Sequence, residues 1–178
     1  MGDDNSYDIR TILTQMREEY WQALAEEESE AKEMLECLVF TLGGKRYAFE
    51  THYACEVIRV PKLVRVPAVQ SLIRGIFNLR GEITAAIDIR PMLGVPQPEI
   101  GATGRILVVR AENFATGILV EAAHGVQGLC FDCFEPVAAG SGVKAQFIRG
   151  HFNLEEGSVI LLDMEALLAA PELVAGDA

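Results

Sequence analysis

The chain lacks any long apolar run. Half of its 178 residues are hydrophobic, yet no uncharged apolar stretch approaches the roughly 18 to 20 residues that a membrane-spanning helix needs. The first ten residues, MGDDNSYDIR, are acidic and polar, whereas a secretory signal starts with basic residues and continues with apolar ones. We therefore expect a soluble intracellular protein without direct membrane insertion, large enough for one domain or two very small ones.

Cysteine is scarce and poorly spaced for a metal site. Cys130 and Cys133 form a CxxC pair, but Cys37 and Cys55 are far apart in the sequence, whereas paired zinc ligands are separated by roughly two to four residues. In an extended strand, the two side chains of the CxxC pair would also point to opposite faces. The sequence predicts free thiols, no metal and no cofactor, and it leaves a redox role of the CxxC pair open.

The motifs of common enzyme classes are missing. The three histidines are scattered, no GxSxG nucleophile elbow occurs, and GATG at 101–104 lacks the GK[ST] ending of a phosphate-binding loop. Catalysis needs a base, a nucleophile or a metal in convergent positions. We expect a protein that is not an enzyme.

Basic residues are in the minority, with 15 against 26 acidic ones, which argues against nucleic acid as a partner because lysine and arginine neutralise phosphates. The imbalance varies along the chain. Residues 1–36 contain eleven acidic and three basic residues. Residues 37–110 contain five acidic and ten basic residues, and residues 111–178 contain ten acidic and two basic residues. Opposite charge on the two parts of the body favours head-to-tail contacts between molecules, which build rings or arrays.

Residues 1–36 are predicted to form an acidic amphipathic helical extension. Apolar residues between Ile9 and Leu35 recur with helical spacing, without an intervening glycine or proline. Ser6 or Asp8 can cap the start of the helix. Two interpretations stay open, because the apolar stripe suits either packing on the protein's own domain or binding to a partner.

One nine-residue segment occurs twice. IRGIFNLRG at 73–81 returns as IRGHFNLEE at 148–156, and IDIRPML at 87–93 aligns at the same offset with LDMEALL at 162–168. Short strand-like runs surround both copies in the same order. This pattern predicts a mainly β fold of two small antiparallel barrels related by duplication, the first at about 37–100 and the second at about 101–168.

The repeated letters are interpreted as scaffold. Gly75 and Gly150 are expected at points of unusual backbone angle or close packing, and Phe77 and Phe152 are expected in the core. The copies differ where Arg80-Gly81 is replaced by Glu155-Glu156. The fold does not dictate this change of charge, so we expect functional divergence there, with Arg80 available for bidentate contact with a partner carboxylate.

Several segments together resemble the CheW-like domain, the adaptor of bacterial chemosensory arrays. They are LVFTLGGKRYAF, CEVIRV, GIFNLRGEI, IDIRPMLG, GILVE and LLDMEALL, and the match runs from about Glu36 to Leu168. The resemblance implies two five-stranded SH3-like β-barrels without catalytic activity. It also implies two partners, the cytoplasmic tip of methyl-accepting chemoreceptors and the regulatory domain of a CheA-type histidine kinase, with contacts to other CheW-like domains in rings.

The resemblance also implies a partner-binding surface. Arg80 matches the arginine of the family's NLRG motif, so Asn78 and Gly81 are included, and Ala54, Glu56, Val57 and Arg59 match a strand associated with partner contact. Val120 is expected in an apolar groove for a receptor helix, although core packing is an alternative for Val57 and Val120. The second-barrel motif Val-Asp of the family is Val120-Glu121 here. The alternative function is a ligand-sensing module or small enzyme that uses the cleft between the barrels.

Overall fold

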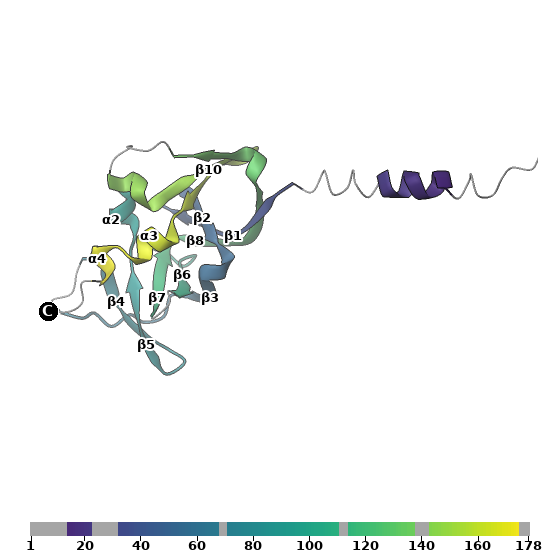
Figure 1. Ribbon diagram of the computed structural model, residues 1–178. Coiled ribbons are helices and arrows are strands. Elements are labelled where there is room, and N and C mark those ends of the chain that lie inside the picture. Colours follow the sequence, from purple (N-terminus) through teal and green to yellow (C-terminus); the bar gives the residue numbers. More distant parts are fainter. Residues whose placement is uncertain (1–13, 23–31, 68–70, 111–113, 138–142, 175–178) are drawn as a thin grey trace, which may run out of the picture. The chain divides into compact units, whose positions relative to one another are not determined.

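The computed structural model describes residues 14–22, 32–67, 71–110, 114–137 and 143–174 (Figure 1). The chain divides into two compact units, Met1–Glu33 and Met34–Ala178. In the first unit, residues 14–22 are helical and exposed. Met34 and Leu35 already belong to the first strand, so the predicted helical extension to residue 36 is wrong at its end. Residues 32 and 33 are not helical either. Residues 1–13 and 23–31 of that prediction lie outside the described residues.

Two sheets make up the second unit. The six-stranded sheet has the order β8-β1-β2-β11-β10-β9, and the five-stranded sheet has the order β3-β6-β7-β5-β4. The prediction of a mainly β fold is thereby confirmed. The strands are β1 (Met34–Leu42), β2 (Lys45–Glu50), β3 (Ala54–Arg59), β4 (Ile73–Leu79), β5 (Glu82–Ile87), β6 (Arg105–Arg110), β7 (Ala115–Val120), β8 (Ala122–Cys130), β9 (Phe134–Pro136), β10 (Ile148–Leu154) and β11 (Gly157–Leu162).

The helices of this unit are short. They are the 3-10 turns η1 (Thr51–Tyr53), η2 (Phe131–Cys133) and η3 (Val143–Phe147) and the α-helices α2 (Arg90–Leu93), α3 (Met164–Leu168) and α4 (Pro171–Val174). Within the described residues, no helix has the length and apolar character needed to cross a membrane.

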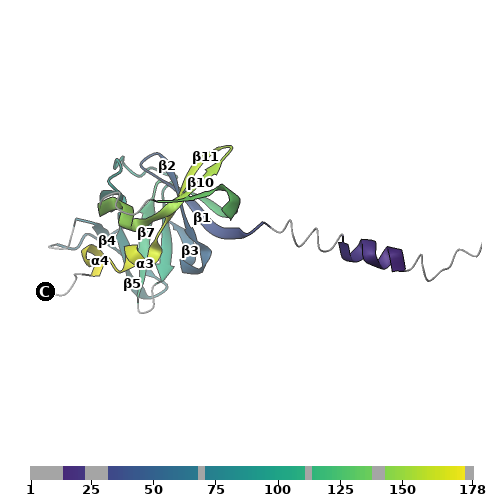
Figure 2. The ribbon, with the colours of Figure 1, turned by 45° about the horizontal axis from the view of Figure 1, so that its top comes forward.

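The two sheets exchange hairpins, which corrects the predicted barrel boundaries. The β1–β2 hairpin does not lie with β3–β5; instead β2 pairs in parallel with β11 of the second copy, and Figure 2 shows these segments side by side. In the same way, β7 of the second copy pairs in parallel with β5 of the first. A division at about residue 100 is therefore wrong, because each sheet combines a hairpin from one copy with strands from the other.

The duplication extends to the backbone. In both copies the strand register shifts within the Ile-Arg-Gly segment, between Ile73 and Gly75 and between Ile148 and Gly150. A Cβ atom on Gly75 would lie 2.8 Å from the carbonyl oxygen of Val64, and one on Gly150 would lie 2.4 Å from that of Glu135. The prediction that both glycines mark close packing is confirmed, since no side chain fits between these backbones.

Three hydrophobic clusters fill the second unit. Alternate residues of β1 face different clusters, because neighbouring side chains of a strand point to opposite faces. Leu38 and Phe40 join a central cluster to which both sheets contribute, whereas Cys37 and Val39 join a cluster inside the six-stranded sheet. A third cluster lies inside the five-stranded sheet. Phe77 is 3% exposed and belongs to the cluster inside the five-stranded sheet, and Phe152 is 0% exposed and belongs to the cluster inside the six-stranded sheet. Their predicted core positions are therefore confirmed.

The four cysteines are free. Cys37 is fully buried, and burial raises the pKa of its thiol to about 12. Cys130 precedes the η2 turn and Cys133 is its last residue, and both are partly buried. Cys55 is exposed on β3.

Candidate functional site

The β4–β5 hairpin ends in a two-residue turn made of Arg80 and Gly81. Leu79 pairs with Glu82 across it, and the φ angles of Arg80 and Gly81 are 54° and 97°. Positive φ at both central residues is the geometry of a type I′ turn, which suits the twist of a hairpin. The Asn78 side-chain oxygen accepts a hydrogen bond from the Gly81 amide at 2.8 Å. The hairpin projects from the sheet (Figure 1), and Arg80 lies in the turn at its end.

Arg80 forms an ion pair with Glu56 of β3. Its Nη2 lies 3.1 Å from Glu56 Oε2, and the two side chains are 81% and 26% exposed. The structure thus brings together two residues that the sequence placed 24 positions apart. One guanidinium nitrogen makes this contact, and a guanidinium carries five N–H donors, so donors remain for a further carboxylate.

Arg80 holds an unfavourable backbone conformation. Among the described residues it is the one non-glycine residue with positive φ, a region that costs an L-residue roughly 1 kcal/mol or more. The equivalent turn of the second copy differs: Leu154 pairs with Gly157, and positive φ falls on Gly157, not on the intervening glutamates. The change from Arg-Gly to Glu-Glu therefore alters both the charge and the turn geometry.

The other predicted contact residues on β3 lie on two faces. The burial of β3 alternates, with Val57 and Arg59 exposed and Ala54 and Glu56 partly buried. Val57 is 43% exposed, so the alternative of core packing is wrong for this residue. Ile83, near the hairpin tip, is 69% exposed.

Val120 does not line a groove. It is 0% exposed and belongs to the central cluster, because its position on β7 points it toward the residues of both sheets. The predicted receptor contact at Val120 is therefore wrong, and core packing is its role. The same central cluster occupies the region between the sheets, which disfavours the alternative function of a sensor or enzyme in an inter-barrel cleft.

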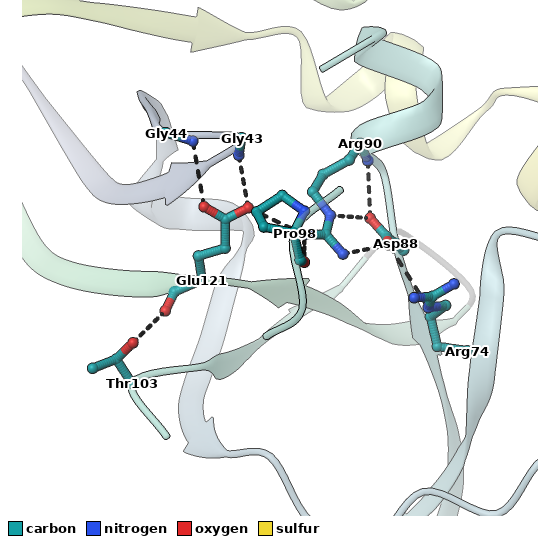
Figure 3. A network of polar contacts seen from close by, with 8 residues as sticks. All are labelled: Gly43, Gly44, Arg74, Asp88, Arg90, Pro98, Thr103 and Glu121. Atoms are coloured by element: carbon teal, nitrogen blue, oxygen red, sulfur yellow. Dashed lines mark hydrogen bonds and ion pairs between the residues drawn. The ribbon is translucent and has the colours of Figure 1, made fainter. Parts of the chain in front are cut away.

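A buried ionic network begins at the end of β5 (Figure 3). Asp88 and Arg90 are each 1% exposed and form a bidentate pair, with Arg90 Nε 2.8 Å from Asp88 Oδ1 and Nη2 2.8 Å from Oδ2. The Arg90 amide also donates to Asp88 Oδ1 at 3.1 Å. The hydrogen bonds to Asp88 raise the pKa of Arg90 against the opposing effect of burial, so the guanidinium stays charged.

Glu121 extends this network to the β1–β2 turn. Its Oε1 accepts hydrogen bonds from Arg90 Nη1 at 3.1 Å and from the Gly43 amide at 2.8 Å, and its Oε2 accepts one from Gly44 at 3.3 Å. Arg90 Nη1 also donates to the Pro98 carbonyl at 2.8 Å. Because β1 and β2 belong to the six-stranded sheet and β5 and β7 to the other, the network joins the two sheets (Figure 3).

Sequence reasoning missed this network. Arg90 counts among the ten basic residues of the segment 37–110, whose charge was expected to act in contacts between molecules, whereas its side chain is buried. Asp88 and Asp163 occupy equivalent positions of the two copies. Asp163 caps α3, since its Oδ1 accepts from the Ala166 amide at 2.9 Å, whereas the side chain of Asp88 is engaged by Arg90. One feature of the sequence could have indicated the network. Arg90 follows Asp88 by two residues, whereas the equivalent residue after Asp163 in the second copy is Glu165, which cannot pair with an aspartate.

Among the described residues, no group of three or more histidine, cysteine or acidic side chains is arranged to hold a metal ion. The chemistry of the exposed site is instead that of a charged contact surface. It consists of an arginine in the turn of the β4–β5 hairpin, its glutamate partner and exposed apolar side chains on two strands.

Comparison with known proteins identifies relatives over most of the second unit. A family model described as CheW-like domain matches residues 36–172. The chemotaxis protein CheW of Bacillus subtilis is 35% identical over 89 residues, which cover 50% of this chain and 57% of that protein. The chemotaxis protein CheW of Klebsiella aerogenes is 27% identical over 143 residues, covering 80% of this chain and 86% of that protein.

A solved structure has the same fold. The scaffolding protein TtCheW from Thermoanaerobacter tengcongensis superposes with a TM-score of 0.70 at 23% identity, over 79% of this chain and 96% of that chain. The overall fold of the second unit is thus shared with this solved structure. A further relative, the protein PilI of Pseudomonas aeruginosa, is 26% identical over 66% of each chain.

Proposed function

Because the chain belongs to the CheW-like domain family, we propose that it is a non-catalytic adaptor that couples methyl-accepting chemoreceptors to a CheA-type histidine kinase. The match of the family model to residues 36–172, which include nearly all of the second unit's strands, is the observation that carries this proposal. We further propose that the protein acts in the cytoplasm, where it is recruited to membrane-associated receptor arrays. Relatives named chemotaxis protein CheW support both statements.

We propose that partners bind the surface formed by Arg80, Asn78, Gly81, Glu56, Ala54, Val57 and Arg59. An exposed ion pair such as Arg80–Glu56 stabilises a fold by about 0–1 kcal/mol, and the strained turn at Arg80 offsets that gain. The contribution of Arg80 to the free energy of folding therefore does not explain why an arginine occupies this position. A guanidinium held at a hairpin tip with unused donors is instead well suited to a partner carboxylate.

Contacts with other CheW-like domains are also part of the proposal. Because the two sheets exchange hairpins, we count the charges for each sheet and not for each copy. Residues 51–121, which contain the strands of the five-stranded sheet, include eight basic and six acidic residues. Residues 122–178, which belong mainly to the six-stranded part, contain two basic and eight acidic residues. The basic part of one domain and the acidic part of another attract each other, which favours head-to-tail rings with a kinase regulatory domain or another copy.

Replacing Arg80 with glycine separates binding from stability. Glycine adopts positive φ without strain, so the free energy of unfolding is expected to stay within about 0.5 kcal/mol of wild type or to rise. Loss of the charge-assisted contact is expected to weaken binding to the kinase regulatory domain or the receptor tip by about 10- to 100-fold. Calorimetric titration and urea unfolding measure the two quantities.

The matched control is Arg110→Gly, which removes an exposed arginine at the end of β6. Its affinity for both partners is expected to equal that of wild type. Unchanged affinity of Arg80→Gly for both partners would remove Arg80 from the binding surface, and a large loss of stability would assign it a structural role instead.

A further inference from the structure

A cavity of about 530 Å³ opens in the five-stranded part of the fold. Its volume lies in the range of sites for small organic ligands. The aliphatic part of its wall consists of Leu63, Val66, Ile73 and Leu119, and the polar part consists of Arg65, Ser71 and Arg74. Leu63 and Leu119 also belong to the cluster inside the five-stranded sheet or pack against it, whereas Ile73 packs against the central cluster. The cavity therefore adjoins both clusters.

Both arginines of the cavity have donors to offer. Arg65 is exposed and has no hydrogen bond or ion pair with any residue that the structure describes. The Arg74 side chain is 47% exposed, and its Nε lies 3.7 Å from Asp88 Oδ2. That carboxylate already accepts three N–H groups from Arg90, so Arg74 is a secondary partner with a long contact.

The second copy shows which lining residues are particular to this cavity. A smaller cavity, of about 360 Å³, is lined there by Ile148, the counterpart of Ile73, together with other residues and no arginine. Arg149, the counterpart of Arg74, pairs closely with Glu50 of β2. The two cavities share one pair of equivalent lining residues, Ile73 and Ile148, and the polar side chains of the second are His151 and Ser158. Two guanidinium groups are therefore particular to the cavity of the first copy.

We propose that the cavity binds a small organic anion. Its carboxylate or phosphate group is held by Arg65 and Arg74, with the Ser71 hydroxyl as a further donor, because the planar guanidinium matches two oxygens of such groups. A short aliphatic portion of the ligand packs on Leu63, Val66 and Ile73. The site shares no residue with the Arg80–Glu56 surface, so ligand binding goes beyond the adaptor function and does not depend on it.

The test is isothermal titration of the full chain with four probes. Hexanoate and hexyl phosphate carry an anion on an aliphatic chain, whereas hexanol and hexylamine carry the same chain without one. Saturable one-site binding of hexanoate or hexyl phosphate, with a Kd below about 1 mM, is expected, with no binding of the other two. Tighter binding of hexyl phosphate assigns a phosphate ligand, and tighter binding of hexanoate assigns a carboxylate.

Arg65→Gln is the variant that locates the site. Since Arg65 makes no hydrogen bond or ion pair with the described residues, the variant is expected to unfold like wild type while its affinity for the better probe falls at least about 10-fold. Arg110→Gln and Arg80→Gly are expected to bind the probe like wild type. Absence of saturable binding to wild type, or equal affinity of Arg65→Gln and wild type, would overturn the proposal while leaving the adaptor function untouched.

Discussion

Replacing Arg90 with methionine is expected to lower the free energy of unfolding by about 3–5 kcal/mol. The side chain of Arg90 is 1% exposed and donates to Asp88, Glu121 and the Pro98 carbonyl. Methionine has a similar volume but no charge. It leaves Glu121 without its cation and Asp88 with only the long contact to Arg74, and a buried, poorly paired charge costs several kcal/mol. Equilibrium unfolding in urea, followed by circular dichroism, measures the loss.

Two further variants make this result specific. Arg110→Met removes an exposed arginine and is expected to change stability by less than about 0.5 kcal/mol. Arg90→Lys keeps the charge without the planar fork and is expected to fall between wild type and Arg90→Met, which keeps the test informative if Arg90→Met does not fold. A loss of less than 1 kcal/mol in Arg90→Met would show that the network does not hold the two sheets together.

Phe152→Ala is expected to cost a similar amount, about 3–5 kcal/mol. Phe152 is 0% exposed in the cluster inside the six-stranded sheet. Its ring lies 5.0 Å from that of Phe134 and 6.1 Å from that of Phe131, measured between centroids. Truncation leaves a cavity that these rings and the paired strands cannot fill, because close-packed interiors relax only in part.

Thermal and urea unfolding of Phe152→Ala measure this cost. Phe114→Ala is the matched control, since Phe114 is 42% exposed, and its loss of stability is expected to stay below about 1 kcal/mol. Equal losses for the two phenylalanine variants would contradict the assignment of Phe152 to a packed barrel core.

Local features of the fold could be predicted from the sequence. The repeat at 73–81 and 148–156 predicted two related barrels, and Gly75, Gly150, Phe77 and Phe152 lie as expected because their roles depend on local pairing and packing. The exchange of the β1–β2 hairpin was not predictable in this way. Exchanged and unexchanged arrangements have the same strand order along the chain and the same hydrophobic alternation, so periodicity cannot distinguish them.

The candidate site was predictable to a smaller extent. The charge difference between Arg80-Gly81 and Glu155-Glu156 pointed to the hairpin tip, but the contact between Arg80 and Glu56 depends on how two strands 24 residues apart fold together. The prediction for Val120 was wrong because β7 is buried on both faces. The sequence of such a strand is apolar throughout and does not show which side chains face solvent. Arg90 was missed because a buried arginine is rare unless it is paired, and its partner Glu121 is distant in the sequence.

Co-sedimentation with receptor-bearing vesicles tests the adaptor function most directly. Vesicles that display the cytoplasmic portion of a methyl-accepting chemoreceptor are incubated with a CheA-type kinase, with or without the full chain, and the kinase in the pellet is quantified. We predict that the chain increases the sedimented kinase severalfold and that Arg80→Gly does not. Equal amounts of sedimented kinase with and without the chain would contradict the proposal that this protein links receptor and kinase.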